Sequence, residues 1–96
     1  MITAQRRASA VELDYPQEGE IVSLRGYTIR LSGPATAVEI AVDGGEWLSC
    51  RRAAGHWWCD WSGYGPGRHQ ILVRSRDGAD GDWTFRTRRF LAEETR

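Results

Sequence analysis

The segment Val38-Glu-Ile-Ala-Val-Asp-Gly-Gly-Glu-Trp-Leu-Ser-Cys50 combines the clearest strand pattern of the chain with its strongest turn signal. Val38, Ile40 and Val42 alternate with other residues, so an extended strand would place all three on one buried face. Asp43-Gly44-Gly45 follows at once, and glycine tolerates the positive φ that a tight hairpin requires. The segment therefore predicts a β-hairpin whose second strand returns toward Cys50.

The same period-two pattern recurs between glycine-rich breaks, whereas no segment longer than a few residues has a helical period. The expected strands cover residues 11–15, 21–24, 27–31, 38–42, 47–51, 57–61, 68–76 and 83–91. Within the last of these, Arg88-Arg89 interrupts the alternation and indicates a bulge or a strand end. This spacing of short strands and turns predicts an all-β, antiparallel β-sandwich of about seven strands, with a small barrel as the alternative.

Ninety-six residues, 41% of them apolar, fit one compact domain. We expect it to span residues 10–92, after a disordered N-terminal segment 1–9 and before a frayed C-terminus 93–96, because both ends are polar and unpatterned. Thirteen basic residues, all arginine, balance thirteen acidic ones. A neutral chain has no overall field to attract nucleic acid or an anionic membrane, so neither is expected as a partner.

The sequence shows neither a signal peptide nor an apolar run approaching the roughly 20 residues of a membrane span. We therefore expect a cytoplasmic protein, or an exported one if the chain was cut from a longer parent.

Both cysteines lie in the stretch Cys50-Arg-Arg-Ala-Ala-Gly-His-Trp-Trp-Cys59. If Ala54-Gly55 forms a two-residue hairpin loop, Cys50 faces Cys59 in a non-hydrogen-bonded pair with Cα atoms about 4.5 Å apart. A disulfide accepts that separation. Cys50 and Cys59 are therefore a candidate disulfide, although the cytosol would keep both thiols reduced.

Patterns typical of catalysis or metal binding are missing. His56 and His69 could complete a Cys2His2 zinc site with the two cysteines, but the paired spacing of structural zinc sites is absent and His69 falls on another expected strand. We find no paired catalytic carboxylates, nucleophile elbow, serine and histidine constellation or phosphate loop. The sequence predicts a non-enzymatic protein with neither metal nor cofactor.

The tryptophans cannot all be buried, because neighbouring positions on a strand face opposite sides. A two-residue Gly44-Gly45 loop would send Trp47 and Trp58 inward, whereas a bulged loop slips the register by one. We prefer the bulge, since it buries the more apolar set, which is Leu48, Cys50, Trp57, Cys59 and Trp61. It leaves Trp47 and Trp58 exposed and Arg51 free to lie on Trp58.

Two surfaces therefore become candidates for interaction. Exposed Trp47 and Trp58 could form the centre of a protein interface or stack on a sugar ring, or they could be half covered by arginine stems. If the last two strands pair, their outer face would carry a row of arginines that either forms a basic patch or is neutralised by Asp77, Asp80, Asp82 or Glu39. The predicted interaction residues are Trp47, Arg51, Trp58, Arg74, Arg76, Arg86 and Arg88.

The order of these motifs resembles the immunoglobulin-like, E-set C-terminal domain through which sulfite-oxidase-type molybdenum enzymes dimerise. The resemblance covers residues 13–81. Asp43-Gly44-Gly45 and Trp47 match its hairpin, which is one residue shorter here, and Pro66-Gly67 and Val73-Arg74 match its later strand. Many bacterial immunoglobulin-like domains share these turn and core motifs.

The resemblance implies an immunoglobulin-like β-sandwich that associates through one face. The pterin-binding domain and catalytic cysteine of that family have no counterpart here. We expect a non-catalytic interaction module that self-associates, as a homodimer for example, or is accessory to a larger protein or enzyme complex. The alternative is a carbohydrate-binding module that stacks sugars on exposed tryptophans.

Overall fold

The computed structural model describes residues 11–23, 26–62 and 64–93, and every regular element within them is a β-strand. The strands are β1 (Glu12–Tyr15), β2 (Ile21–Ser23), β3 (Tyr27–Ser32), β4 (Ala37–Val42), β5 (Leu48–Ser49), β6 (Arg51–Ala53), β7 (His56–Trp61), β8 (Gly67–Arg76) and β9 (Thr84–Glu93). Segment 1–9, for which disorder is predicted, and residues 94–96 of the predicted frayed end 93–96 lie outside the described residues, whereas Glu93 is the last residue of β9 and pairs with Ser23. The described part contains no helix that could cross a membrane.

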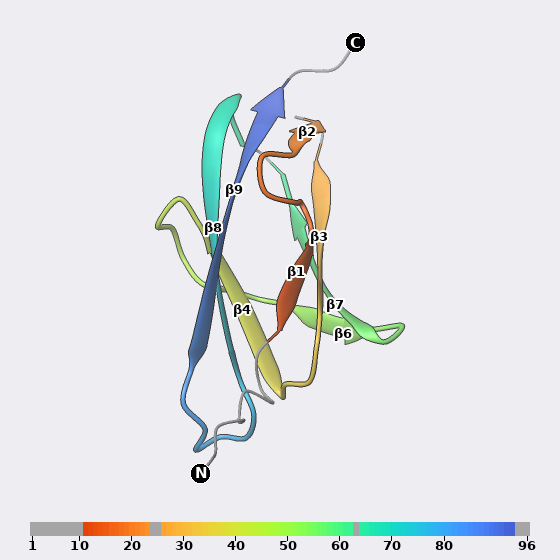
Figure 1. The fold of residues 1–96 in the computed structure, drawn as a ribbon, viewed down its shortest axis with the longest axis vertical. Helices are drawn as coiled ribbons and strands as arrows, with labels where there is room; N and C mark the ends of the chain where they lie inside the picture. Colours follow the sequence, from red (N-terminus) through yellow and green to blue (C-terminus); the bar gives the residue numbers. More distant parts are fainter. Residues whose placement is uncertain (1–10, 24–25, 63, 94–96) are drawn as a thin grey trace.

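The strands form two layers, a four-stranded sheet in the order β1-β3-β7-β6 and a five-stranded sheet in the order β2-β9-β8-β4-β5 (Figure 1). All strand pairs are antiparallel except β2 with β9, which is parallel. The apolar side chains of both inner faces meet in one core, which includes Ile29, Leu31, Ile40 and Ile71. The prediction of an immunoglobulin-like β-sandwich is confirmed.

Turn chemistry sets the two hairpins that the sequence predicts. Asp43 and Gly44 have φ values of 54° and 76°, and the Gly45 N–H donates to the Val42 carbonyl over 2.9 Å. Positive φ at both central residues is the type I′ turn. Strand β5 then pairs with β4 so that Leu48 lies opposite Ile40. This is the slipped register expected for a bulged loop.

Leu48 nevertheless remains 39% exposed, which corrects the expectation that it is buried. It faces the same side as Ile40, but β5 is the edge strand of its sheet and no further strand covers it. The rest of the predicted inward set behaves as expected. Trp57 and Cys59 are buried, and Cys50 and Trp61 pack against the core.

The expected strand over residues 47–51 is divided between the two sheets. Leu48–Ser49 forms β5 of the five-stranded sheet, and Arg51–Ala53 forms β6 of the four-stranded one. Cys50 is the residue at the crossover, and its N–H donates to the Val38 carbonyl of β4 over 2.8 Å. The hairpin after it is as predicted, with Arg51 opposite Trp58 and Ala53 opposite His56.

Strands β8 and β9 pair over nine consecutive positions, from Gly67 opposite Ala92 to Ser75 opposite Thr84. The register does not shift at Arg88-Arg89, so the bulge or strand end expected there is wrong. Ile71 and Val73 point into the core, and their partners on β9 are Arg88 and Arg86. Because opposite residues point to the same side, these two arginines lie on the inner side of the sheet.

Candidate functional site

The outer face of the five-stranded sheet carries a stack of alternating tryptophan and arginine side chains. The Cζ atom of Arg74 lies 4.1 Å from the ring centroid of Trp47 and 4.3 Å from that of Trp83, and the Cζ atom of Arg76 lies 4.4 Å from the Trp83 centroid. Arg74 and Arg76 are two residues apart on β8, so their Cα atoms are about 7 Å apart. The Trp83 ring therefore fits between the two guanidinium groups. We call Trp47, Arg74, Trp83 and Arg76 the Trp–Arg ladder.

Strand register holds the ladder in place. Arg74 lies opposite Glu39 on β4, and its Nε donates to Glu39 Oε1 over 2.7 Å. On its other side Arg74 lies opposite Phe85, whose ring centroid is 6.5 Å from that of Trp47. The ladder is half-buried, whereas Phe85 is 50% exposed. The face thus presents a fixed aromatic and cationic surface with an exposed apolar ring beside it.

Three of the predicted interaction residues, Trp47, Arg74 and Arg76, are brought together in this ladder. Glu39 neutralises Arg74, as one interpretation of the sequence anticipated. Trp83 and Phe85 are not among the interaction residues that the sequence predicts. They are two residues apart at the start of β9, and this period-two spacing of aromatic residues on one face was the signal that could have revealed them.

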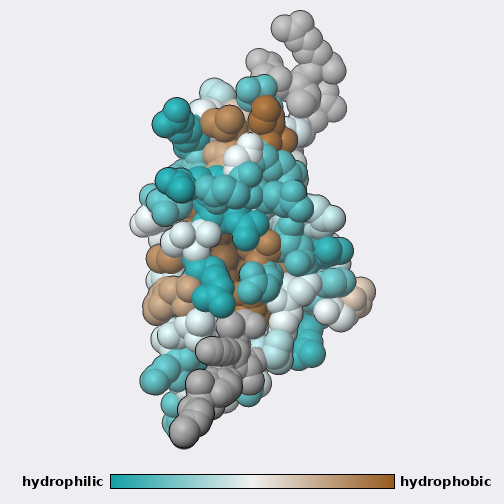
Figure 2. Space-filling view, viewed as in Figure 1, coloured by the Kyte–Doolittle hydropathy of each residue, from teal (hydrophilic) through white to brown (hydrophobic). Residues whose placement is uncertain are grey.

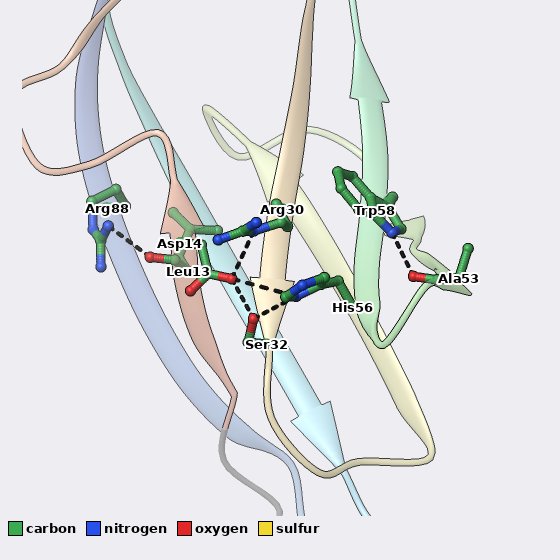
Figure 3. A network of polar contacts seen from close by, with 8 residues as sticks. All are labelled: Leu13, Asp14, Arg30, Ser32, Ala53, His56, Trp58 and Arg88. Carbon is green, nitrogen blue, oxygen red and sulfur yellow. Dashed lines mark hydrogen bonds and ion pairs between the residues drawn. The ribbon is translucent and has the colours of Figure 1, made fainter.

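The predicted row of four arginines does not form, because Arg86 and Arg88 point to the other side of the sheet. Arg88 Nη1 donates to the Leu13 carbonyl oxygen over 3.0 Å (Figure 3). It also donates to the Pro16 carbonyl oxygen over 3.1 Å. Arg86 Nη2 lies 4.0 Å from Glu12 Oε2. The two arginines therefore hold β1 and the following turn against β9 and are not part of an outer basic patch.

Trp58 lies on the outer face of the four-stranded sheet, away from Trp47. Its Nε1–H donates to the Ala53 carbonyl over 2.7 Å (Figure 3). Arg51, the cross-strand neighbour of Trp58, directs its Nη1 to Asp60 Oδ2 at 3.2 Å instead of lying on the indole. The predicted pairing of Trp47 with Trp58, and the predicted Arg51 stack, are therefore replaced by separate contacts on opposite faces.

Ser32, His56 and Asp14 meet on this same face without forming a catalytic arrangement (Figure 3). Ser32 Oγ donates to Asp14 Oδ2, and His56 Nδ1 lies 2.8 Å from Ser32 Oγ. A serine nucleophile needs a base that accepts its proton. Here the Ser32 hydroxyl donates to the Asp14 carboxylate, so its proton is not directed at His56 Nδ1. The cluster, completed by Arg30 Nε 3.1 Å from Asp14, joins β1, β3 and β7.

His69 connects two loops at one end of the sandwich. Its Nδ1 lies 2.6 Å from Asp43 Oδ2 and its Nε2 2.7 Å from the Gly65 carbonyl oxygen. Both partners are acceptors, so the arrangement suits a doubly protonated imidazolium. Because both nitrogens are committed, His69 cannot act as a base toward the adjoining open groove of about 430 Å³. We call His69, Asp43 and Gly65 the histidine clamp.

The clamp shifts the pKa values of its two charged members in opposite directions. Burial lowers the pKa of His69, but the hydrogen bonds to Asp43 and Gly65 outweigh it and raise the pKa above 6.5. Burial raises the pKa of Asp43, yet the hydrogen bonds from His69 and the Gln70 N–H lower it below 3.8. Each charge thus stabilises the other.

Cys50 and Cys59 are free thiols, and Cys59 is buried at 6% exposure. The interaction between the two thiols raises the pKa of Cys50 and lowers that of Cys59, and Cys59 Sγ also lies 4.0 Å from the Asp60 carbonyl oxygen. The disulfide stays a prediction.

The predicted interaction residues and the two histidines do not converge on one centre. His56 lies with Ser32 on one sheet, and His69 lies with Asp43 at the end of the other. Within ranges 11–23, 26–62 and 64–93, no three histidine, cysteine or acidic side chains are grouped so that they could hold a metal ion.

Neither family models nor curated proteins match the sequence. Solved structures do match the fold. Fibronectin(III)-like modules of Clostridium thermocellum CbhA superpose with a TM-score of 0.72 at 21% identity, over 91% of this chain and 100% of the module. The endo-beta-1,4-mannanase from Thermotoga petrophila matches with a TM-score of 0.76 at 10% identity, over 95% of this chain and 21% of the enzyme.

An engineered protein of known crystal structure matches with a TM-score of 0.72 at 20% identity, over 88% of this chain and 20% of its own. This chain therefore spans about a fifth of the length of the engineered protein and of the mannanase. At these identities the likeness concerns the fold alone. The chain has the immunoglobulin-like β-sandwich fold that fibronectin(III)-like modules also have.

Proposed function

We propose that this chain is a non-catalytic accessory module that binds a protein, either a partner or a second copy, through the outer face of its five-stranded sheet. The observation that carries the proposal is the Trp–Arg ladder with exposed Phe85 beside it. Tryptophan and arginine are the residue types most enriched among those that contribute most to protein interfaces. Stacking and the Glu39 hydrogen bond hold these side chains before a partner arrives, which lowers the entropy lost on binding.

Structural neighbours support the accessory role. The module of CbhA is a separate fibronectin(III)-like unit, and in the mannanase and the engineered protein the matching region is about a fifth of the chain. The sequence resemblance to the dimerisation domain of sulfite-oxidase-type enzymes supports association through a face. The polar clusters of the described residues add no group placed to act as a nucleophile with its base.

The alternative, a carbohydrate-binding module, has less support in the geometry. Sugar rings stack on the open faces of aromatic rings, but guanidinium groups cover ring faces of Trp47 and Trp83. Trp61 is stacked on Tyr64, with ring centroids 3.6 Å apart. Trp58 lies on the opposite face, so it does not extend the aromatic surface of the ladder for a polysaccharide.

Light scattering over a concentration series tests the proposal in its simplest form, with a second copy as the partner. We expect the solution mass to rise with concentration and Phe85→Ser to reduce this association at least tenfold, because the exposed ring would lie inside the interface. Trp58→Ala is the matched control, since Trp58 lies on the opposite face, and it should leave the association unchanged.

If the chain remains monomeric, the same two variants are compared in the binding of the larger polypeptide or complex that contains it. Equal effects of Phe85→Ser and Trp58→Ala, or none from Phe85→Ser, would contradict the assignment of this face. Retention of a polysaccharide on a glycan array by the wild-type chain and its loss in Trp58→Ala would favour the carbohydrate alternative instead.

A further inference from the structure

The two cysteines occupy a place in the fold that a simple hairpin would not give them. Cys50 is the crossover residue between the sheets, and its N–H is bonded to Val38 of the five-stranded sheet. Cys59 lies in the middle of β7 in the four-stranded sheet. Continuing the observed register of β6 and β7 by one position places Cys50 opposite Cys59. The two thiols therefore meet where the sheets are joined.

Cys59 borders a groove, although its side chain faces inward and is 6% exposed. It contributes to the wall of an open groove of about 340 Å³ at the edge of the sandwich. The other walls come from β5, from Arg51 and from the two neighbours of Cys59 on β7, and they are Leu48, Ser49, Arg51, Trp58 and Asp60. The interaction with the Cys50 thiol lowers the pKa of Cys59, against the effects of burial and of Asp60, and Arg51 adds a smaller effect in the same lowering direction. Local opening of the short strands β5 and β6 beside this groove would expose the sulfur to a small reagent.

We propose that Cys50 and Cys59 form a redox-active dithiol, in which Cys59 is the attacking thiol and Cys50 the resolving thiol, and which a small-molecule disulfide oxidises to a bond that ties the two sheets together. This inference does not depend on the interface proposed above.

The reaction proceeds by two thiol–disulfide exchanges. The Cys59 thiolate, whose proton has passed to solvent, attacks one sulfur of the reagent; a Cys59 mixed disulfide forms and one reagent thiolate leaves. Cys50 then gives its proton to the released thiolate and attacks Cys59 Sγ, which breaks the mixed disulfide and expels the second thiolate. Two protein thiols are oxidised to one disulfide, and one reagent disulfide is reduced to two thiols.

The assignment of roles follows from the surroundings of each sulfur. The neighbouring Cys50 thiol and, to a smaller extent, Arg51 lower the pKa of Cys59, although burial and Asp60 oppose them, and the groove lies beside this residue. The pKa of Cys50 is raised by its interaction with Cys59, by its packing against the core and, least, by Glu39, and all three disfavour its thiolate. Cys50 therefore attacks second, when a mixed disulfide on Cys59 lies next to its sulfur and this proximity offsets its small thiolate fraction.

The experiment exposes the full folded chain to glutathione disulfide and follows free thiols and intact mass. We expect both thiols to disappear, the mass to fall by two hydrogen atoms and the chain to stay monomeric on a non-reducing gel. The oxidised chain should unfold about 10 °C higher than the reduced chain, because the bond restricts the unfolded state.

Single variants test the roles. Cys50→Ser should accumulate one glutathione on Cys59, because no resolving thiol remains. Cys59→Ser should react at Cys50 at least tenfold more slowly than Cys50→Ser reacts at Cys59. The same reagent in urea provides the control, since both thiols of the unfolded chain should then react at similar rates.

Persistence of two free thiols in the folded chain while the urea sample reacts would overturn the proposal. So would a disulfide-linked dimer, a stable double adduct, or an oxidised chain that is no more stable than the reduced one. These readouts use the wild-type chain, so the proposal can fail even if replacement of buried Cys59 prevents folding.

Discussion

Ala54 has a φ of 52° and is one of two non-glycine residues with positive φ in the described part of the chain. With Gly55 at 78° it forms the type I′ turn between β6 and β7. Alanine has no side-chain hydrogen bond to offset the steric cost of this conformation, which is about 1 kcal/mol or more. Asparagine tolerates it better, and Asn-Gly is the preferred pair for this turn.

We therefore expect Ala54→Asn to raise the free energy of unfolding by about 0.5 to 1 kcal/mol, measured by urea denaturation. Ala53→Asn is the control, since Ala53 is equally exposed but lies on the strand, and it should give no gain. A lower midpoint for Ala54→Asn would mean that the turn does not adopt this conformation in solution.

Arg88 and Arg86 offer a second comparison between single residues. Arg88 donates to the Leu13 and Pro16 carbonyls and is 22% exposed, whereas Arg86 is 44% exposed and has one ion pair at 4.0 Å. Hydrogen bonds from a charged donor contribute about 1.5 to 3 kcal/mol, and exposed ion pairs contribute about 0 to 1 kcal/mol. Arg88→Ala should thus lower the free energy of unfolding by about 2 kcal/mol.

Arg86→Ala should lower it by less than about 1 kcal/mol. Chemical denaturation of both variants measures the difference, and equal losses would show that Arg88 does not bind the β1 segment as described.

Between elements, the histidine clamp joins the β4–β5 turn to the segment before β8, and it makes stability depend on pH. The raised pKa of His69 gives stability that is complete below 6.5 and is lost as the pH rises through the folded value. The lowered pKa of Asp43 gives stability that is complete above 3.8 and is lost as the pH falls through its folded value. Both contributions to stability are therefore complete only between pH 3.8 and 6.5.

His69→Gln should abolish this dependence. The difference in thermal midpoint between the wild-type chain and the variant should be largest within that window and decrease on both sides of it. Its size should correspond to about 1 kcal/mol, because Asp43 is half exposed and solvent screens the pair. A difference that grows steadily above pH 7 would contradict the clamp.

The elements that could be predicted from sequence are those fixed by local chemistry. Ala54-Gly55 and Asp43-Gly44 carry their own turn signals, so the hairpins and the inward position of Trp57 and Cys59 follow from a few neighbouring residues. Register across a longer connection has no such signal. The loop from Asp77 to Asp82 does not determine whether Arg74 lies opposite residue 85 or 86, and a difference of one position reverses the face of every side chain on β9.

The candidate site depended on that same register. With Phe85 opposite Arg74, the aromatic residues Trp83 and Phe85 come to the outer face and the two arginines of β9 leave it. The crossover at Cys50 could not be predicted for a related reason, because the switch between sheets is determined by which edges are available for pairing. Both features follow from contacts between segments that are distant in the sequence.

Across the whole molecule, pairing is concentrated in the middle of the five-stranded sheet. β8 and β9 are ten residues each and pair over nine positions, and β8 is also paired with β4 over six. The edges are short, with two residues in β5 and three in β6. Arg74 and Arg76 thus stand on the most extensively paired strand of the fold, whereas the crossover lies between two of its shortest strands.

Amide hydrogen exchange should reproduce this distribution. Amides at the centre of β8, such as that of Val73, should exchange only by global unfolding, because β4 and β9 hydrogen-bond the strand on both sides. Amides of β5 and β6 should exchange at least a hundredfold faster through local opening. This distribution suits the proposed binding face, since a rigid centre keeps Arg74 and Arg76 of the ladder in place while the edges open independently. Uniform protection across both sheets would contradict it, and faster exchange in β8 than in β6 would place the rigid part of the molecule elsewhere.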